Sequence, residues 1–110
     1  MEKESQNKKV YIAGKITNLP YEEVKQRFAA VAENLKAHGY EPVNPCEVSP
    51  FREGKEWREY MADCIPALIR CDYILMLSGW LDSEGAKLEH YVARAFKIQI
   101  LFEKEITSKS

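Results

Sequence analysis

Short apolar runs of strand length alternate with longer amphipathic stretches along almost the whole chain. The apolar runs lie at 10–13, 40–43, 73–77 and 98–102. Each stretch between two of these runs is long enough to hold a helix, which is the connection that parallel strands need. The resulting order β-α-β-α-β-α-β predicts right-handed crossovers and a parallel sheet with helices on both faces. The run at 73–77 is apolar throughout, which is typical of a central parallel strand.

The amphipathic stretches carry apolar side chains at helical spacing. The first follows Pro20 and ends at Gly39, a natural C-cap, and its stripe is Val24, Phe28, Val31, Ala32 and Leu35. The second contains Pro66, which we expect to kink the helix because proline removes a backbone donor. Its stripe is Trp57, Tyr60, Met61, Cys64, Ile65, Leu68 and Ile69. The third helix carries its stripe on Leu88, Tyr91, Val92, Ala95 and Phe96.

The chain of 110 residues has the length of one domain. We expect that domain to span residues 9–102, between a polar tail at 1–8 and another at 103–110. The predicted fold class is therefore a single-domain α/β protein. It is a three-layer sandwich of the Rossmann or flavodoxin-like type, with a parallel sheet of about four or five strands.

Composition excludes several classes of function. The charge is nearly balanced, with 16 basic and 17 acidic residues, and the basic residues are scattered, so no nucleic-acid partner is expected. No apolar run approaches the roughly 20 residues that cross a bilayer, and the start of the chain lacks the apolar core of a signal peptide. We therefore expect a cytoplasmic protein without a membrane partner. Cys46, Cys64 and Cys71 lack CxxC spacing, which predicts no metal site and no disulfide.

The fold class predicts where a ligand binds. In open parallel sheets, ligands bind beyond the carboxyl ends of the strands, where the strand order reverses. Two loops should meet there: the loop after Ala13 and the loop Ser78–Gly85. The first is no GxGxxG turn and the second is no P-loop, so a dinucleotide or a nucleoside triphosphate bound in the usual way is not expected.

Glu89 lies one turn into the third predicted helix, at the margin of its apolar stripe. The helix N-terminus should favour the ionised form of its carboxylate. An acidic residue at such a position is usually a surface charge that matches the helix dipole, so Glu89 by itself does not identify a site.

Several motifs occur together in a fixed order along the chain. They are Tyr11-Ile12-Ala13-Gly14, Val43-Asn44-Pro45, Cys71-Asp72 and the run Gly79-Trp80-x-x-Ser83-x-Gly85-Ala86-x-x-Glu89. In this combination the chain resembles the nucleoside 2-deoxyribosyltransferase superfamily. It is most similar to a small branch of uncharacterised bacterial and phage proteins that share the Gly-Trp-x-x-Ser-x-Gly-Ala run. The resemblance extends from Lys9 to Phe102.

The resemblance implies an enzyme that cleaves or exchanges the N-glycosidic bond of 2′-deoxynucleosides or their 5′-monophosphates. Glu89 would be the nucleophile, and no metal or organic cofactor is implied. It further implies a homo-oligomer, a dimer or larger, and a nucleoside or nucleotide as the small-molecule partner. The substrate-binding residues implied are Tyr11, Gly14, Lys15, Trp80, Asp82, Ser83 and Gly85.

Three of these assignments have alternatives. Trp80 could stack on a base or equally lie at a contact between subunits. The superfamily's proton-donor aspartate would fall on Cys64, with Asp63 one residue earlier, so Asp63 is either the proton donor or a solvated charge. If it is not the donor, the chain is a catalytically weak nucleotide-binding module of the same fold. A structural oligomerisation domain is the third possibility. Ser83 either contacts a 5′-phosphate or simply caps the third helix.

Overall fold

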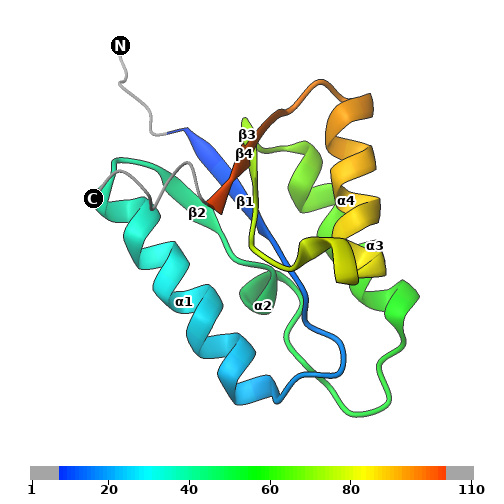
Figure 1. Ribbon diagram of the computed structural model, residues 1–110. Helices are drawn as coiled ribbons and strands as arrows, with labels where there is room; N and C mark the ends of the chain where they lie inside the picture. The colour runs from blue at the N-terminus through cyan, green and yellow to red at the C-terminus, as the bar shows by residue number, and fades with distance from the viewer. Residues whose placement is uncertain (1–7, 104–110) are drawn as a thin grey trace.

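A computed structural model describes residues 8–103 (Figure 1). The element order confirms the predicted α/β fold, and each predicted strand is found within one residue of its expected bounds. The strands are β1 (Lys9–Ala13), β2 (Glu41–Val43), β3 (Tyr73–Met76) and β4 (Gln99–Phe102). The helices are α1 (Tyr21–Ala37), α2 (Pro45–Val48), α3 (Trp57–Ile69), α4 (Glu84–Ala95) and the short 3-10 helix η1 (Trp80–Asp82).

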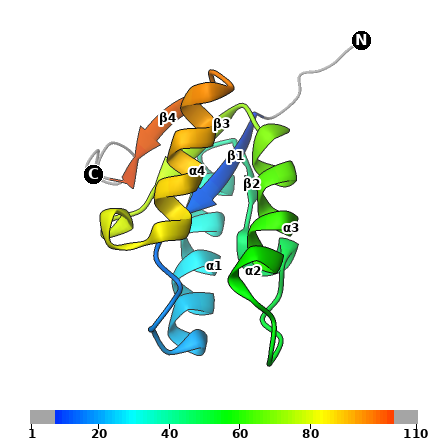
Figure 2. The same cartoon turned by 90° about the vertical axis from the view of Figure 1, so that its right-hand side faces the viewer.

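The four strands form one parallel sheet in the order β2-β1-β3-β4. This is a Rossmann or flavodoxin-like sandwich, with α1 on one face of the sheet and α3 and α4 on the other (Figures 1 and 2). Side chains of a strand alternate between the two faces. In β1, Val10 and Ile12 therefore pack against α1, whereas Tyr11 and Ala13 belong to the core beneath α3 and α4.

Helix α1 buries the face that its spacing predicted. Val24, Phe28, Ala32 and Leu35 are buried against the sheet. The chain then leaves the helix through Gly39, whose φ of +88° is readily adopted only by glycine. Helix α3 is one continuous helix from Trp57 to Ile69, with Pro66 inside it.

The buried face of α4 differs from the apolar stripe that the sequence predicted for this helix. Its buried residues are Ala86, Glu89 and Ala93, whereas Tyr91 and Phe96 of the predicted stripe are 69% and 58% exposed. The two alanines are small enough to let the helix backbone approach the neighbouring layer closely. Glu89 lies between them and is therefore carried into the interior rather than left at the margin.

Two other local features differ from the prediction. Helix α2 was not predicted, although Asn44 and Pro45 are residues that favour an N-cap and a first helical position, and the Asn44 side chain accepts a hydrogen bond from the Cys46 amide. Glu103 was expected to begin a tail, but its carboxylate accepts hydrogen bonds from Arg27 and from the Ser78 amide. The rest of the predicted tail at 103–110, and most of that at 1–8, lie outside the described residues.

No helix in the described part of the chain has the length and apolarity needed to cross a membrane.

Candidate functional site

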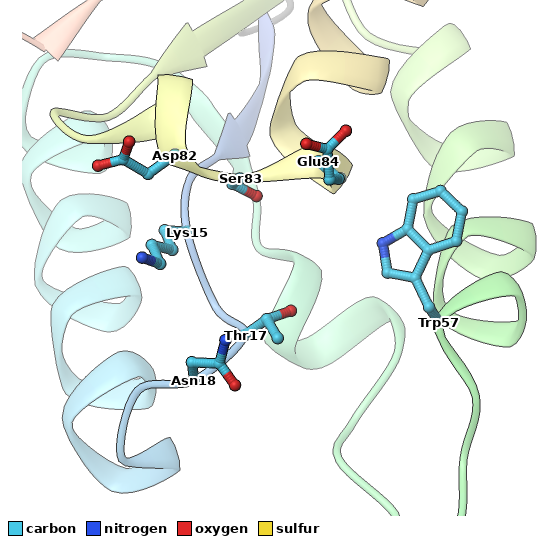
Figure 3. A pocket seen from close by; sticks show the side chains of 8 residues that line it. Lys15, Thr17, Asn18, Trp57, Asp82, Ser83 and Glu84 are labelled. Carbon is cyan, nitrogen blue, oxygen red and sulfur yellow. The ribbon is translucent and has the colours of Figure 1, made fainter.

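A cleft of about 460 Å³ lies beyond the carboxyl ends of β1 and β3 (Figure 3). It is lined by the loop after β1, by the segment from η1 into α4 and by the start of α3. The lining residues are Lys15, Thr17, Asn18, Trp57, Asp82, Ser83, Glu84 and Gly85. Because the strand order reverses between β1 and β3, this is the position at which the fold class predicts a ligand site. The two loops named from the sequence do meet here.

The close packing of β1 and β3 fixes the start of both loops. Ala13 is paired with Met76, and the amide of Leu77 donates a hydrogen bond to the carbonyl of Ala13 at 2.9 Å. A Cβ atom on Gly14 would lie 3.0 Å from Leu77 Cδ1 and 3.2 Å from Phe28 Cζ. Gly14 is thus buried in close contact with these two side chains. It does not line the cleft, although the resemblance implied it as a substrate-binding residue.

Glu89 is a buried carboxylate with one described hydrogen-bond donor. It is 6% exposed, and the hydroxyl of Tyr11, itself fully buried in β1, donates to Glu89 Oε2 at 2.7 Å. Burial raises the pKa of Glu89 to about 7, while the hydrogen bond from Tyr11 lowers it. Burial therefore opposes the ionised form that the helix N-terminus was expected to favour.

The thiol of Cys64 lies on the α3 side of the same buried group. Cys64 is 5% exposed and belongs to the core cluster that contains Tyr11. Burial raises the pKa of Cys64 to about 11 and holds the pKa of Tyr11 well above its ordinary value. Both groups are therefore protonated at neutral pH, and Tyr11 remains a hydrogen-bond donor to the carboxylate.

Gly85 connects the cleft to Glu89. It lines the cleft at the start of α4, and Glu89 follows four residues later on the same helical face. A Cβ atom on Gly85 would lie 3.4 Å from both Met61 Sδ and Trp57 Nε1 of α3. The side chains of Met61 and Trp57 thus pack at the start of α4, one helical turn before the buried carboxylate.

Asp63 lies apart from this buried group. Its side chain is exposed and accepts a hydrogen bond from Ser49 Oγ at 2.7 Å, with Lys55 Nζ 3.3 Å away. The hydrogen bond from Ser49 and the neighbouring Lys55 lower the pKa of Asp63. A carboxylate that is held ionised by these partners is poorly suited to donate a proton, so the geometry does not support Asp63 as the general acid.

The position of Ser83 suits both roles considered for it, as the cap of a helix and as a contact for a phosphate. Its hydroxyl accepts a hydrogen bond from the Ala86 amide at 3.1 Å, which confirms Ser83 as the N-cap of α4. The same residue lines the cleft beside Asp82 and Glu84, across from Lys15 (Figure 3). The cation and the helix N-terminus favour an anion here, and the two neighbouring carboxylates oppose it.

Trp80 is placed differently from the expectation. Its ring stacks on His90, with the ring centroids 4.6 Å apart, and it packs against the core rather than lining the cleft. Sequence reasoning assigned neither Trp57 nor the pair Thr17 and Asn18 to the site. The sequence placed Trp57 on an apolar stripe of the second predicted helix. Asn18 is a residue type common in turns, and its φ of +68° in the structure agrees with that role.

No group of three His, Cys, Asp or Glu side chains among residues 8–103 is arranged to hold a metal ion.

Comparison with known proteins gives a family without an assigned activity. No curated protein matches the sequence. A family model described as a domain of unknown function, DUF4406, matches residues 8–102, which is nearly all of the described chain. The chain therefore belongs to the DUF4406 family.

Proposed function

We propose that this protein cleaves or exchanges the N-glycosidic bond of 2′-deoxynucleosides or their 5′-monophosphates, with Glu89 as the nucleophile. The observation that carries the proposal is the buried Glu89 carboxylate, hydrogen-bonded to Tyr11 one helical turn from the cleft. The sequence resemblance to the nucleoside 2-deoxyribosyltransferase superfamily supports the same residue. A cytoplasmic homo-oligomer is part of this proposal and rests on the resemblance and the composition.

The proposed reaction has two steps. The ionised carboxylate of Glu89 attacks the anomeric carbon and forms a deoxyribosyl ester, while the bond to the base nitrogen breaks and the base, which keeps the bonding electrons, takes a proton from solvent water. Water or a second base then attacks the same carbon, loses a proton to solvent and releases the Glu89 carboxylate. The Tyr11 hydroxyl orients the carboxylate and stabilises its ionised form. The sugar would have to enter along Gly85, at the side chains of Met61 and Trp57.

The choice between nucleosides and monophosphates depends on the cleft. A 5′-phosphate would find Lys15, the hydroxyl of Ser83 and the N-terminus of α4. The carboxylates of Asp82 and Glu84 line the same cleft and would disfavour a dianion or accept hydrogen bonds from sugar hydroxyls. Both substrate classes therefore belong in the test.

A second candidate is a nucleotide-binding module with little catalytic activity. The arrangement of Asp63 favours it, because the side chain expected to protonate the leaving base is occupied by Ser49 and Lys55. Such a protein would bind the ligand in the cleft and leave the glycosidic bond intact.

The test is incubation of the full chain with deoxynucleosides and their 5′-monophosphates, followed by chromatography for free base. We expect base release from the wild type and none from Glu89→Gln. A Glu89→Gln variant that keeps even about a tenth of the activity would exclude Glu89 as the nucleophile. Ligand binding without base release from any substrate would favour the binding module.

A further inference from the structure

Trp57 is a large aromatic side chain left half exposed at the edge of the cleft. It is the first residue of α3 and is 50% exposed. Figure 3 shows its indole across the cleft from Lys15 and Thr17, with the indole nitrogen on the cleft side. Among the described residues that line the cleft, Trp57 is the only aromatic one.

The neighbours of Trp57 limit where its ring can lie. The indole nitrogen is close to Gly85, where a Cβ atom would lie 3.4 Å from it, and Met61 Sδ is at the same distance from that position. One edge of the indole thus lies against the start of α4, while Trp57 as a whole stays half exposed.

Polar groups face Trp57 from the loop after β1. The side chains of Thr17 and Asn18 line the opposite wall of the cleft (Figure 3). Asn18 has a φ of +68°, a conformation that asparagine tolerates better than most residues, so the loop presents this amide at a defined turn. A hydroxyl and an amide together offer both donors and acceptors to the edge of a planar ring.

We propose that Trp57 is the platform on which the base of a deoxynucleoside or deoxynucleotide stacks, with Thr17 and Asn18 at the edge of that base. The identity of the ring as a nucleobase rests on the proposed function. This assignment gives Trp57 the role that the sequence suggested for Trp80, whose ring is already stacked on His90. Stacking tolerates any base, because every base has a π-face, so Trp57 provides affinity and the polar pair provides selectivity.

The test measures binding by calorimetry in the Glu89→Gln background, so that the ligand stays intact. The ligands are the deoxynucleosides, their 5′-monophosphates and, as a ligand without a base, deoxyribose 5-phosphate. Loss of one base–aromatic stack weakens binding by roughly 5- to 160-fold. We expect Trp57→Ala to raise the Kd of the monophosphates within that range. We expect Trp57→Phe, which keeps an aromatic ring, to restore most of the affinity.

Two controls separate stacking from a general defect. The Kd of deoxyribose 5-phosphate should be the same with and without Trp57. Tyr91→Ala, which removes a more exposed aromatic side chain away from the cleft, should leave every Kd unchanged. Thermal unfolding of Trp57→Ala verifies that the fold is retained.

The outcomes distinguish this inference from the proposed function. Trp57-dependent binding of monophosphates without base release by the wild type would support the stacking role and reject the enzyme. Base release that depends on Glu89, together with a monophosphate Kd unaffected by Trp57→Ala, would overturn the stacking role alone. An equal loss for deoxyribose 5-phosphate, or no binding of any deoxynucleoside or monophosphate, would also overturn it.

Discussion

Replacing Glu89 with glutamine removes a buried ionisable group while keeping its shape and an oxygen that can accept the Tyr11 hydrogen bond. The folded-state pKa of Glu89 is about 7, against an ordinary value of 4.5. Because the folded pKa is raised, the folded protein binds the proton more tightly than the unfolded chain does. The contribution of Glu89 to stability is therefore fully present below about pH 4.5 and is lost as the pH rises to about 7.

The size of the effect follows from the pKa. One pKa unit corresponds to about 1.4 kcal/mol, so ionising Glu89 in the folded state costs at most about 3 kcal/mol. Glu89→Gln does not bear this cost. It should therefore be more stable than the wild type by up to about 3 kcal/mol at roughly pH 8, and nearly equal to it at roughly pH 4.5. In a domain of this size that difference raises Tm by about 10 °C.

The assay is thermal unfolding of both proteins across this pH range. A matched control is Glu33→Gln, which removes an exposed carboxylate of α1 that pairs with the nearby Lys36. An exposed pair of this kind contributes little to stability, so the control should follow the wild type at every pH. A Tm difference between Glu89→Gln and the wild type that stays constant with pH would refute the buried-carboxylate argument.

Three further substitutions test neighbouring parts of the site. Tyr11→Phe deletes the hydrogen bond that lowers the pKa of Glu89, so the acid limb of base release should move to higher pH; an unmoved limb in the pH–rate profile would contradict this. Ser83→Ala removes the cap of α4 and should cost about 1 kcal/mol in thermal or urea unfolding. If Ser83 also holds a phosphate, kcat/KM should fall further for the monophosphate than for the nucleoside, and the difference should correspond to about 1–2 kcal/mol of transition-state stabilisation. Equal losses of kcat/KM for both substrates would reject the phosphate role. Asp63→Asn should disturb only the contacts with Ser49 and Lys55 and leave base release unchanged for every base; a selective loss on poor leaving bases would instead restore Asp63 as the proton donor.

The sequence by itself determined the order of the elements and the place of the site. The continuous apolar run at 73–77 and the stripe from Val24 to Leu35 are local patterns, and each predicted its element correctly. Parallel strands joined by helices leave few possible topologies, and those topologies place ligands at the carboxyl ends of the strands. The position of the cleft was therefore predictable before any side chain was placed.

Only the tertiary structure decided what the individual side chains do. Glu89 and Tyr11 are far apart in the sequence, and their hydrogen bond exists because α4 packs closely on the sheet through Ala86 and Ala93. That packing removes water from Glu89, and the loss of water sets its pKa.

The roles of the two tryptophans and of Asp63 were likewise decided by the tertiary structure. Periodicity shows that Trp57 lies on an apolar stripe. It does not show that this stripe ends at the cleft, where Trp57 stays half exposed. By sequence alone Trp80 was an equally good candidate for contact with a ligand, yet its ring stacks on His90, two turns into α4. Asp63 is paired with Lys55 because the loop before α3 folds back onto the helix. Such contacts depend on how segments from different parts of the chain pack together, which a local sequence pattern does not encode.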